Sequence, residues 1–233
     1  MDIYCRTRAL LGDAVMERLK HSRVAVFGIG GVGAYCAEGL ARCGVGQLEL
    51  IDPDTVSESN INRQLIALRS TVGRSKAAVM AERIADIDPE TGVRIHEVFY
   101  DEHTRSRFEL SEYDFIADCI DTVTSKLLLI REAKEAGVPI ISCLGTGNRL
   151  HPERFRVADI YETSGCPLAR IMRRLCRENG IERLRVVFSD EPAAPITVEE
   201  ENGRHPPASV SFVPPAAGMV MCGEIVRSLI GQG

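Results

Sequence analysis

The sequence contains eight cysteines but no C-x-x-C pair and none of the close cysteine spacing that is typical of zinc ribbons. It therefore gives no support to a structural zinc site built from cysteines. Positive charge is not in excess either, since the sequence has 28 lysines and arginines but 33 acidic residues, and the formal net charge is −5. The whole molecule has no polycation character, so any contact with a nucleic acid must come from a local patch.

No run approaches the roughly eighteen consecutive apolar residues that a membrane span needs. The amino-terminal residues 1–6 also lack the apolar stretch of a signal peptide. We therefore expect a cytoplasmic protein with reduced thiols, in which most cysteines are small core residues.

The chain does contain enough apolar material for one large core, because 45% of its 233 residues are hydrophobic. Strand-like apolar runs alternate with segments in which apolar residues recur every three or four positions. This alternation predicts an α/β, Rossmann-like, doubly wound fold with a mainly parallel sheet. The expected strands are residues 23–27, 47–51, 93–99, 114–120 and 138–143, and the expected helices are residues 31–43, 74–87, 102–110 and 122–136.

The last third of the chain has a more irregular pattern. Residues 155–161 and 185–188 resemble strands, whereas residues 167–179 and 216–230 resemble helices. Between them, residues 189–207 hold four prolines and five acids with little periodicity, which predicts a mobile loop. We expect a single domain over residues 1–233, with a nucleotide-binding core at 1–150 and a carboxy-terminal extension at 151–233 packed on it.

A glycine-rich segment directly follows the first expected strand, and its glycines are Gly28, Gly30, Gly31 and Gly33. Such a turn opens a helix whose free backbone N–H groups can face phosphates. Asp52 and Asp54 follow the second expected strand, where an acid can hold a ribose hydroxyl. Asp52 is the better candidate for that contact, and Asp54 either shares it or caps the loop. The pattern predicts a nucleotide site without separating NAD from ATP.

Asn60, Arg63 and Lys76 favour a nucleoside triphosphate. Two cations and an amide neutralise a triphosphate, whereas the pyrophosphate of NAD is already served by the helix amino terminus. Asp121 ends another apolar run at the carboxyl edge of the sheet, where one carboxylate suffices for Mg²⁺ because the ion keeps phosphates and waters as its other ligands. Asp118, earlier in that run, is expected to be buried and hydrogen-bonded or to help start the following helix.

With these motifs in order, the sequence resembles the ubiquitin-activating-type adenylyltransferases, the superfamily that activates sulfur-carrier proteins for molybdopterin and thiamine synthesis. Within it, the chain is most similar to the tRNA threonylcarbamoyladenosine dehydratases. The resemblance covers residues 6–150 approximately and continues through residues 163–170. It rests on the glycine motif, Arg6-Thr7, Asp52-x-Asp54, Ser59-Asn60-x-Asn62-Arg63-Gln64, Lys76 and Asp118-Cys119-Ile120-Asp121-Thr122.

This resemblance implies an ATP-dependent, ligase-type adenylating enzyme that acts on a modified adenosine next to the anticodon of certain tRNAs. The free carboxylate of the threonylcarbamoyl group is adenylated, pyrophosphate leaves, and an internal atom of the same group closes a ring with net loss of water. The alternative is an adenylyltransferase that activates the carboxy-terminal glycine of a ubiquitin-like sulfur-carrier protein. A third hypothesis is a nucleotide-binding module that only scaffolds.

The resemblance also assigns roles to particular residues. It places Gly31 and its loop against ATP and Asp52 at the ribose, and Asp121 binds Mg²⁺. Arg6 matches an arginine that reaches across a two-fold dimer into the partner's ATP site, so a homodimer is expected. The sequence leaves open whether a monovalent cation orders a loop and whether a sulfur-transfer protein cooperates. The implied catalytic residues are Arg6, Arg63, Lys76 and Asp121, and Ser59, Asn60, Arg63 and Lys76 are implied to contact the nucleotide.

An arginine cluster is the candidate tRNA patch, with four arginines at helical spacings of three and four residues: Arg170, Arg173, Arg174 and Arg177. The other interpretation is an ordinary charged helix face. No aromatic residues interleave with these arginines, so base-specific recognition is not predicted. Cys166 lies at an expected helix start that would stabilise a thiolate, but the implied reaction needs no protein nucleophile, so a packing or loop role is favoured.

Overall fold

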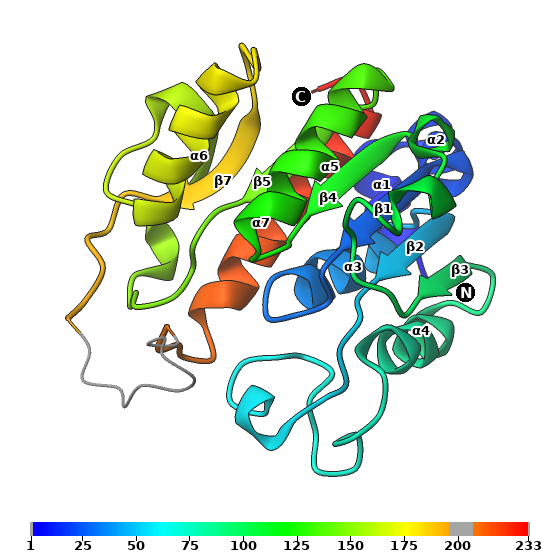
Figure 1. Ribbon diagram of the computed structural model, residues 1–233. Helices are drawn as coiled ribbons and strands as arrows, with labels where there is room; N and C mark the ends of the chain where they lie inside the picture. Colours follow the sequence, from blue (N-terminus) through cyan, green and yellow to red (C-terminus); the bar gives the residue numbers. More distant parts are fainter. Residues whose placement is uncertain (1, 196–206, 233) are drawn as a thin grey trace.

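The computed structural model describes residues 2–195 and 207–232, in which one sheet lies between two layers of helices (Figure 1). The strands lie in the order β3-β2-β1-β4-β5-β7-β6, and β6 is antiparallel to β7 while every other neighbouring pair is parallel. Their bounds are β1 Arg23–Phe27, β2 Gln47–Ile51, β3 Gly92–His96, β4 Phe115–Asp118, β5 Ile140–Cys143, β6 Phe155–Asp159 and β7 Arg185–Ser189.

The helices and short 3₁₀ turns connect these strands. The helices are α1 Cys5–Leu11, α2 Asp13–His21, α3 Gly33–Arg42, α4 Lys76–Ile87, α5 Val123–Glu135, α6 Pro167–Glu178 and α7 Val213–Leu229. The 3₁₀ turns are η1 Glu58–Asn60, η2 Arg105–Arg107, η3 Leu110–Glu112, η4 Pro152–Arg154 and η5 Ile160–Glu162.

Both faces of the sheet are covered, which confirms the predicted doubly wound α/β fold. On one face α3, α4 and α7 bury an apolar cluster that includes Leu40, Met80 and Ile225. On the other face α5 and α6 cover two further clusters, one around Phe27 and one around Met172. The central strands β1 and β4 are therefore buried on both sides, as their continuous apolar runs predicted.

Helix α7 begins at Val213, earlier than the predicted residue 216, because two prolines belong to its first turn. Pro214 and Pro215 lie where a helix needs no backbone N–H and where the fixed φ of proline suits the helix. Helix α4, by contrast, begins at Lys76, later than the predicted residue 74. The Ser75 hydroxyl caps this helix by accepting a hydrogen bond from the backbone N–H of Ala78 at 3.3 Å.

The predicted helix at residues 102–110 is wrong, since that segment holds the 3₁₀ turn η2 and the first residue of the 3₁₀ turn η3. The Asp101 carboxylate accepts hydrogen bonds from the backbone N–H groups of His103 and Thr104, which favours a turn over a helix. The strand predicted at 93–99 ends at His96, because its partner β2 ends at Ile51 and leaves nothing to pair with beyond it.

Helices α1 and α2 precede the first strand and are tied to the rest of the fold. The Tyr4 hydroxyl lies 2.7 Å from the Asp88 carboxylate that follows α4. Burial and that neighbouring carboxylate raise the pKa of Tyr4, so the hydroxyl stays a donor. Met16 and Leu19 of α2 reach the main core. Arg6 therefore belongs to an anchored helix.

Residues 196–206 of the predicted mobile loop lie outside the described residues. Within residues 2–195 and 207–232, no helix has the length and the hydropathy of a membrane span.

The order of the strands positions a ligand site. β1 pairs with β2 on one side and with β4 on the other, and both neighbours are parallel to it. The connections from these strands run in opposite directions, so a crevice opens at the carboxyl ends of β1 and β4.

Candidate nucleotide-binding site

A cavity of about 1110 Å³ opens at the carboxyl ends of β1, β2, β4 and β5. Its walls include the glycine loop, the segments that follow these strands, and the first residues of α5 and α6. Residues far apart in the sequence therefore meet at one place, as the motif order predicted. The predicted site residues in the lining are Gly28, Gly30, Gly31, Asp52, Asp54, Arg63, Lys76 and Asp121.

The glycine loop packs so closely against its surroundings that side chains do not fit. Gly28 has φ of +90°, and a Cβ atom on it would lie 2.7 Å from the carbonyl oxygen of Cys119. A Cβ atom on Gly33 would lie 1.8 Å from the carbonyl oxygen of Gly28. Gly33 thus lies behind the cavity, where it lets α3 start directly against the loop. Gly28, Gly30 and Gly31, which precede α3, line the cavity with backbone atoms alone.

Asp52 fixes the glycine loop as well as lining the cavity. One carboxylate oxygen accepts the backbone N–H of Ile29 at 2.6 Å, and the other accepts the N–H of Asp54 at 2.9 Å. Burial raises the pKa of Asp52 above its ordinary value, although Lys76 and the backbone donors act against the shift. Each oxygen can accept more than one hydrogen bond, so the carboxylate keeps capacity for a ribose hydroxyl.

Lys76 is presented to the cavity by Asp54. Its ammonium group lies 2.7 Å from the Asp54 carboxylate, and the Lys76 side chain is only 8% exposed while that of Asp54 is 62% exposed. The pair holds the lysine stem against the protein and leaves the carboxylate in contact with solvent. Incoming phosphates can therefore share the ammonium group without a change in the backbone.

Arg63 is held by its own loop. Its guanidinium donates to the carbonyl oxygen of Ser59 and to the side chain of Asn62, both at 2.9 Å. Ser59 and Asn60 do not line the cavity. The Asn60 side chain instead accepts the backbone N–H of Ser57 at 3.1 Å and caps the turn η1. These two residues therefore shape the loop that presents Arg63.

Asp121 is exposed in the cavity lining, just after β4. Its carboxylate accepts a long hydrogen bond, 3.4 Å, from the neighbouring Thr122 hydroxyl. Within the described part of the chain, no group of three or more His, Cys, Asp or Glu side chains could hold a metal ion. A lone carboxylate fits Mg²⁺, which takes its remaining ligands from phosphates and water.

Asp118 is fully buried and hydrogen-bonded, as the sequence predicted, and its partner is a lysine that the sequence did not single out. The Lys126 ammonium lies 2.7 Å from the Asp118 carboxylate and 3.0 Å from the carbonyl oxygen of Cys143. Both side chains are 0% exposed. The Ser142 hydroxyl adds a hydrogen bond of 2.6 Å to the same carboxylate. This network joins β4, β5 and α5 beneath Asp121 and fixes the cavity floor.

The candidate tRNA patch on α6 is partly engaged within the protein. Arg173 donates to the carbonyl oxygen of Thr163 at 2.7 Å, and Arg177 lies over the Tyr161 ring at 5.1 Å. Arg174 pairs with Glu178 at 3.1 Å, and Arg170 is exposed. Arg173 is thus occupied in holding the segment before α6.

Cys166 is buried at the amino terminus of α6 and lines the cavity. Arg6 is exposed on α1 and does not line the cavity of its own chain.

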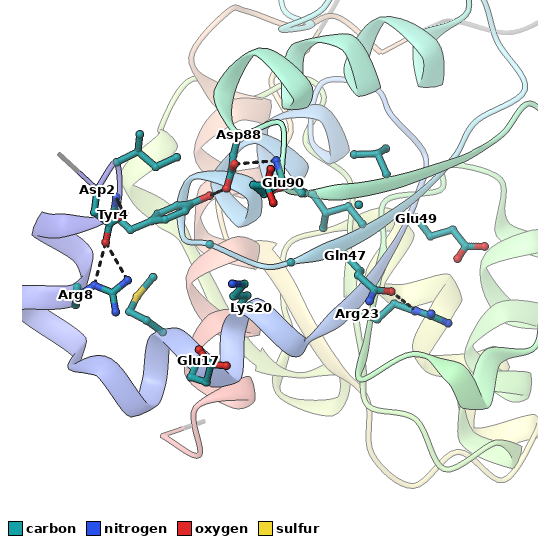
Figure 2. A pocket seen from close by; sticks show the side chains of 18 of the residues that line it. Asp2, Tyr4, Arg8, Glu17, Lys20, Arg23, Gln47, Glu49, Asp88 and Glu90 are labelled. Carbon is teal, nitrogen blue, oxygen red and sulfur yellow. Dashed lines mark hydrogen bonds and ion pairs between the residues drawn. The ribbon is translucent and has the colours of Figure 1, made fainter.

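A second cavity, of about 670 Å³, lies at the opposite edge of the sheet (Figure 2). Its lining includes the first residues of three strands, Arg23, Gln47 and Gly92, together with the tether between Tyr4 and Asp88. Side chains of both charge signs surround it, and no predicted site residue lines it. The predicted nucleotide site therefore lies at the carboxyl edge of the sheet.

A crevice at the switch point of a doubly wound sheet, floored by a glycine loop and bordered by fixed cations, defines a nucleotide-binding α/β protein. Residues 4–233 match the ThiF family, and the chain belongs to that family.

Relatives that match most of this chain have a name more specific than that of the family. The chain is 40% identical over 241 residues to tRNA threonylcarbamoyladenosine dehydratase of Bacillus subtilis, covering 97% of this chain and 94% of the relative. It is 38% identical over 176 residues to the Escherichia coli protein of that name, covering 75% and 66%. The solved structure of the E. coli enzyme in complex with ATP matches with a TM-score of 0.89 and 31% identity, covering 98% of this chain and 94% of that one. The resemblance drawn from the sequence is confirmed.

Proposed function

We propose that this chain is an ATP-dependent adenylating enzyme that dehydrates the threonylcarbamoyl group of threonylcarbamoyladenosine in tRNA. The observation that supports it best is the convergence of Arg63, the Lys76–Asp54 pair and Asp121 on one cavity, in a chain whose relatives bear that name. ATP binding is supported by the ATP complex of the similar E. coli structure.

The residues of this chain fit the first half-reaction. The amino terminus of α3 faces the phosphates, Asp52 accepts a ribose hydroxyl, and Arg63 and Lys76 neutralise the triphosphate. The substrate carboxylate attacks the α-phosphorus and pyrophosphate leaves. The attacking carboxylate oxygen, a poor leaving group by itself, then becomes part of AMP, which is a good leaving group. The protein mainly orients the two reactants and stabilises charge that develops in line.

Asp121 would hold Mg²⁺ together with the phosphates, and the bound ion would neutralise charge on the leaving pyrophosphate. The Asp118–Lys126 network keeps the Asp121 backbone in place while the ligands exchange.

The second half-reaction needs no protein nucleophile. An internal atom of the carbamoyl part attacks the activated carbonyl carbon, a ring closes, and AMP departs with the former carboxylate oxygen. One proton is released from the attacking part, so the substrate loses the elements of water. The walls of the cavity contribute by excluding bulk water, which would otherwise hydrolyse the acyl-adenylate.

The proposal includes a homodimer in which Arg6 of one protomer completes the site of the other, because Arg6 lies outside the cavity of its own chain. It also includes tRNA contacts by the exposed arginines of α6.

The test supplies purified protein with ATP and Mg²⁺ and follows pyrophosphate release. One reaction contains tRNA that bears the threonylcarbamoyl group, a second contains the same tRNA without it, and a third contains a small carrier protein ending in Gly-Gly. We expect release only in the first. Release only with the carrier protein would show that the chain is a sulfur-carrier activator.

A further inference from the structure

Two buried side-chain atoms lack a hydrogen-bond partner within residues 2–195 and 207–232, namely Gln64 Oε1 and Ser209 Oγ. Both residues line the large cavity. A buried polar atom without a partner costs free energy, and native proteins pair nearly all such atoms. Because the two exceptions border the same cavity, their missing partners must come from what fills it.

The two residues belong to one wall beside the glycine loop. A Cβ atom on Gly30 would lie 3.8 Å from Gln64 Nε2, so the amide of Gln64 faces the loop. The Asn62 side chain donates to the carbonyl oxygen of Ser209 at 3.1 Å and joins the two segments. A Cβ atom on Gly31 would lie 3.7 Å from the Arg63 carbonyl oxygen, which places this wall directly against the loop.

The chemistry of Gln64 Oε1 narrows the choice of ligand. A carbonyl oxygen only accepts hydrogen bonds, and ionised phosphates only accept them too, so the phosphates of ATP cannot be its partner. The ribose hydroxyls are donors, but Asp52 is the acceptor placed for them, after β2. The adenine amino group is a donor as well, and the Kd for ATP tests that alternative below. The acyl substrate is the other candidate, because it reacts at the α-phosphate and carries its own donors.

We propose that Gln64 and Ser209 form the subsite for the amino-acid part of the acyl substrate, an inference that rests on the proposed function. Gln64 accepts a hydrogen bond from the threonyl hydroxyl, and Ser209 donates one to the neighbouring carboxylate before it is adenylated. The hydroxyl suits this contact because it takes no part in ring closure. Each side chain reaches the ligand by rotation about its last torsion, which for glutamine is broad.

The two residues are therefore positioning and specificity residues. They distinguish an acyl group with a β-hydroxyl from one without it, because a buried acceptor without a donor penalises the wrong substrate. They act on the acyl substrate and leave the binding of the nucleotide unchanged.

The test compares two tRNA substrates, one with a threonylcarbamoyl adenosine and one with a glycylcarbamoyl adenosine that lacks the hydroxyl. Pyrophosphate release gives kcat/KM for each, and equilibrium dialysis gives the Kd for ATP. We expect the unmodified protein to prefer the threonyl substrate by about tenfold or more, and Gln64→Ala to reduce that preference to about twofold. Gln64→Glu, which keeps an acceptor, retains the preference, and the Kd for ATP stays unchanged in Gln64→Ala.

Ser209→Ala provides a second variant should Gln64→Ala fold poorly, and it should raise KM for both tRNAs without changing the Kd for ATP. Gln47→Ala is the matched control, since Gln47 lies at the opposite edge of the sheet. An equal preference in the unmodified protein and Gln64→Ala overturns the inference alone. A Gln64→Ala variant with a raised Kd for ATP also overturns it, in favour of a nucleotide contact. No release from either tRNA by the unmodified protein overturns both this inference and the proposed function.

Discussion

At Gly33 the protein has room for a hydrogen atom and nothing larger, because a methyl group there would meet the Gly28 carbonyl oxygen at 1.8 Å. Gly33→Ala must push α3 away from the glycine loop, so we expect a loss of about 1–3 kcal/mol in the free energy of unfolding and a large rise in the Kd for ATP. Gly137→Ala is the control, since Gly137 has φ of +71° in open space. Backbone strain of about 1 kcal/mol and normal ATP binding are expected there. Normal ATP binding by Gly33→Ala would contradict the assigned loop.

Arg63 and Asp121 carry the proposed charge stabilisation at the reacting phosphates. We expect Arg63→Ala and Asp121→Ala each to lower the rate of pyrophosphate release by on the order of 10²-fold or more, because preorganised charge is lost from the transition state. Arg69→Ala, an exposed arginine on the same connection and outside the cavity lining, should leave the rate unchanged. Rates near those of the unmodified protein would remove the altered residue from the mechanism.

At the residue scale, the sequence was most informative where chemistry needs one residue type at one place. Gly28, Asp52, Lys76 and Asp121 were predicted and all line the cavity. Lys126 was not singled out, because a lysine among leucines in a helix is usually an exposed surface charge. Only the packing of α5 over β4 and β5 shows that its ammonium is buried against Asp118. The structural roles of Ser59 and Asn60, which shape the loop that presents Arg63, also depend on contacts that no motif contains.

Among the elements, α3 and α4 are joined by Glu38, whose carboxylate bonds to Arg83 at 2.7 Å and to Arg42 at 2.7 Å. Burial alone would raise the pKa of Glu38, but the hydrogen bonds from the two arginines outweigh it, and the pKa lies below its ordinary value. The native pKa is therefore lower than that of the unfolded chain. The resulting stability is present above the unfolded pKa and is lost as the pH falls through the native pKa.

The free energy of unfolding of Glu38→Gln, measured by urea titration from pH 7 to pH 3, checks this linkage. We expect the variant to be less stable by about 1 kcal/mol at pH 7, with the difference shrinking below pH ~4.5. Glu135→Gln, at the exposed end of α5, should show no such difference. A difference for Glu38→Gln that stays constant with pH would contradict the ion-pair explanation.

Helix α6 divides its arginines between structure and the proposed tRNA contact. Arg170→Ala with Arg174→Ala should weaken tRNA binding and reduce the slope of log K against log salt by about 2, because two phosphate contacts are lost. Arg173→Ala should instead lower Tm, since Arg173 holds Thr163. A double change of the exposed Arg107 and Arg131 to alanine alters the net charge equally and should leave the slope unchanged. An unaltered slope in the α6 variant would make this helix an ordinary charged surface.

Element boundaries were predictable where periodicity decides them and not where tertiary pairing does. The strands β1 and β2 begin and end as predicted, whereas β3 ends where its partner ends. The predicted helix began at residue 216, yet Pro214 and Pro215 belong to the first turn of α7. A sequence pattern shows that a proline restricts the backbone, but the surrounding packing decides on which side of it a helix begins.

For the whole molecule, the proposed dimer gives a complementation test. Arg6→Ala and Asp121→Ala should each be nearly inactive alone. If Arg6 acts in the partner's site, a mixed dimer has one site with both residues intact, so mixing equal amounts after exchange of protomers should restore about a quarter of the activity. If Arg6 acts in its own chain, mixing restores nothing, and that result would contradict the shared site. Re-mixing two samples of the same variant is the control.

The sequence by itself determined the class of fold, the family and the order of the nucleotide motifs, because glycine, aspartate and lysine at fixed spacings after apolar runs have few physical interpretations. The tertiary structure alone decided that α7 closes over α3, that the Asp118–Lys126 pair lies under the cavity, and that Gln64 and Ser209 meet at one wall. These contacts join segments far apart in the chain. Local pattern carries no information about which distant side chains burial will leave without a partner.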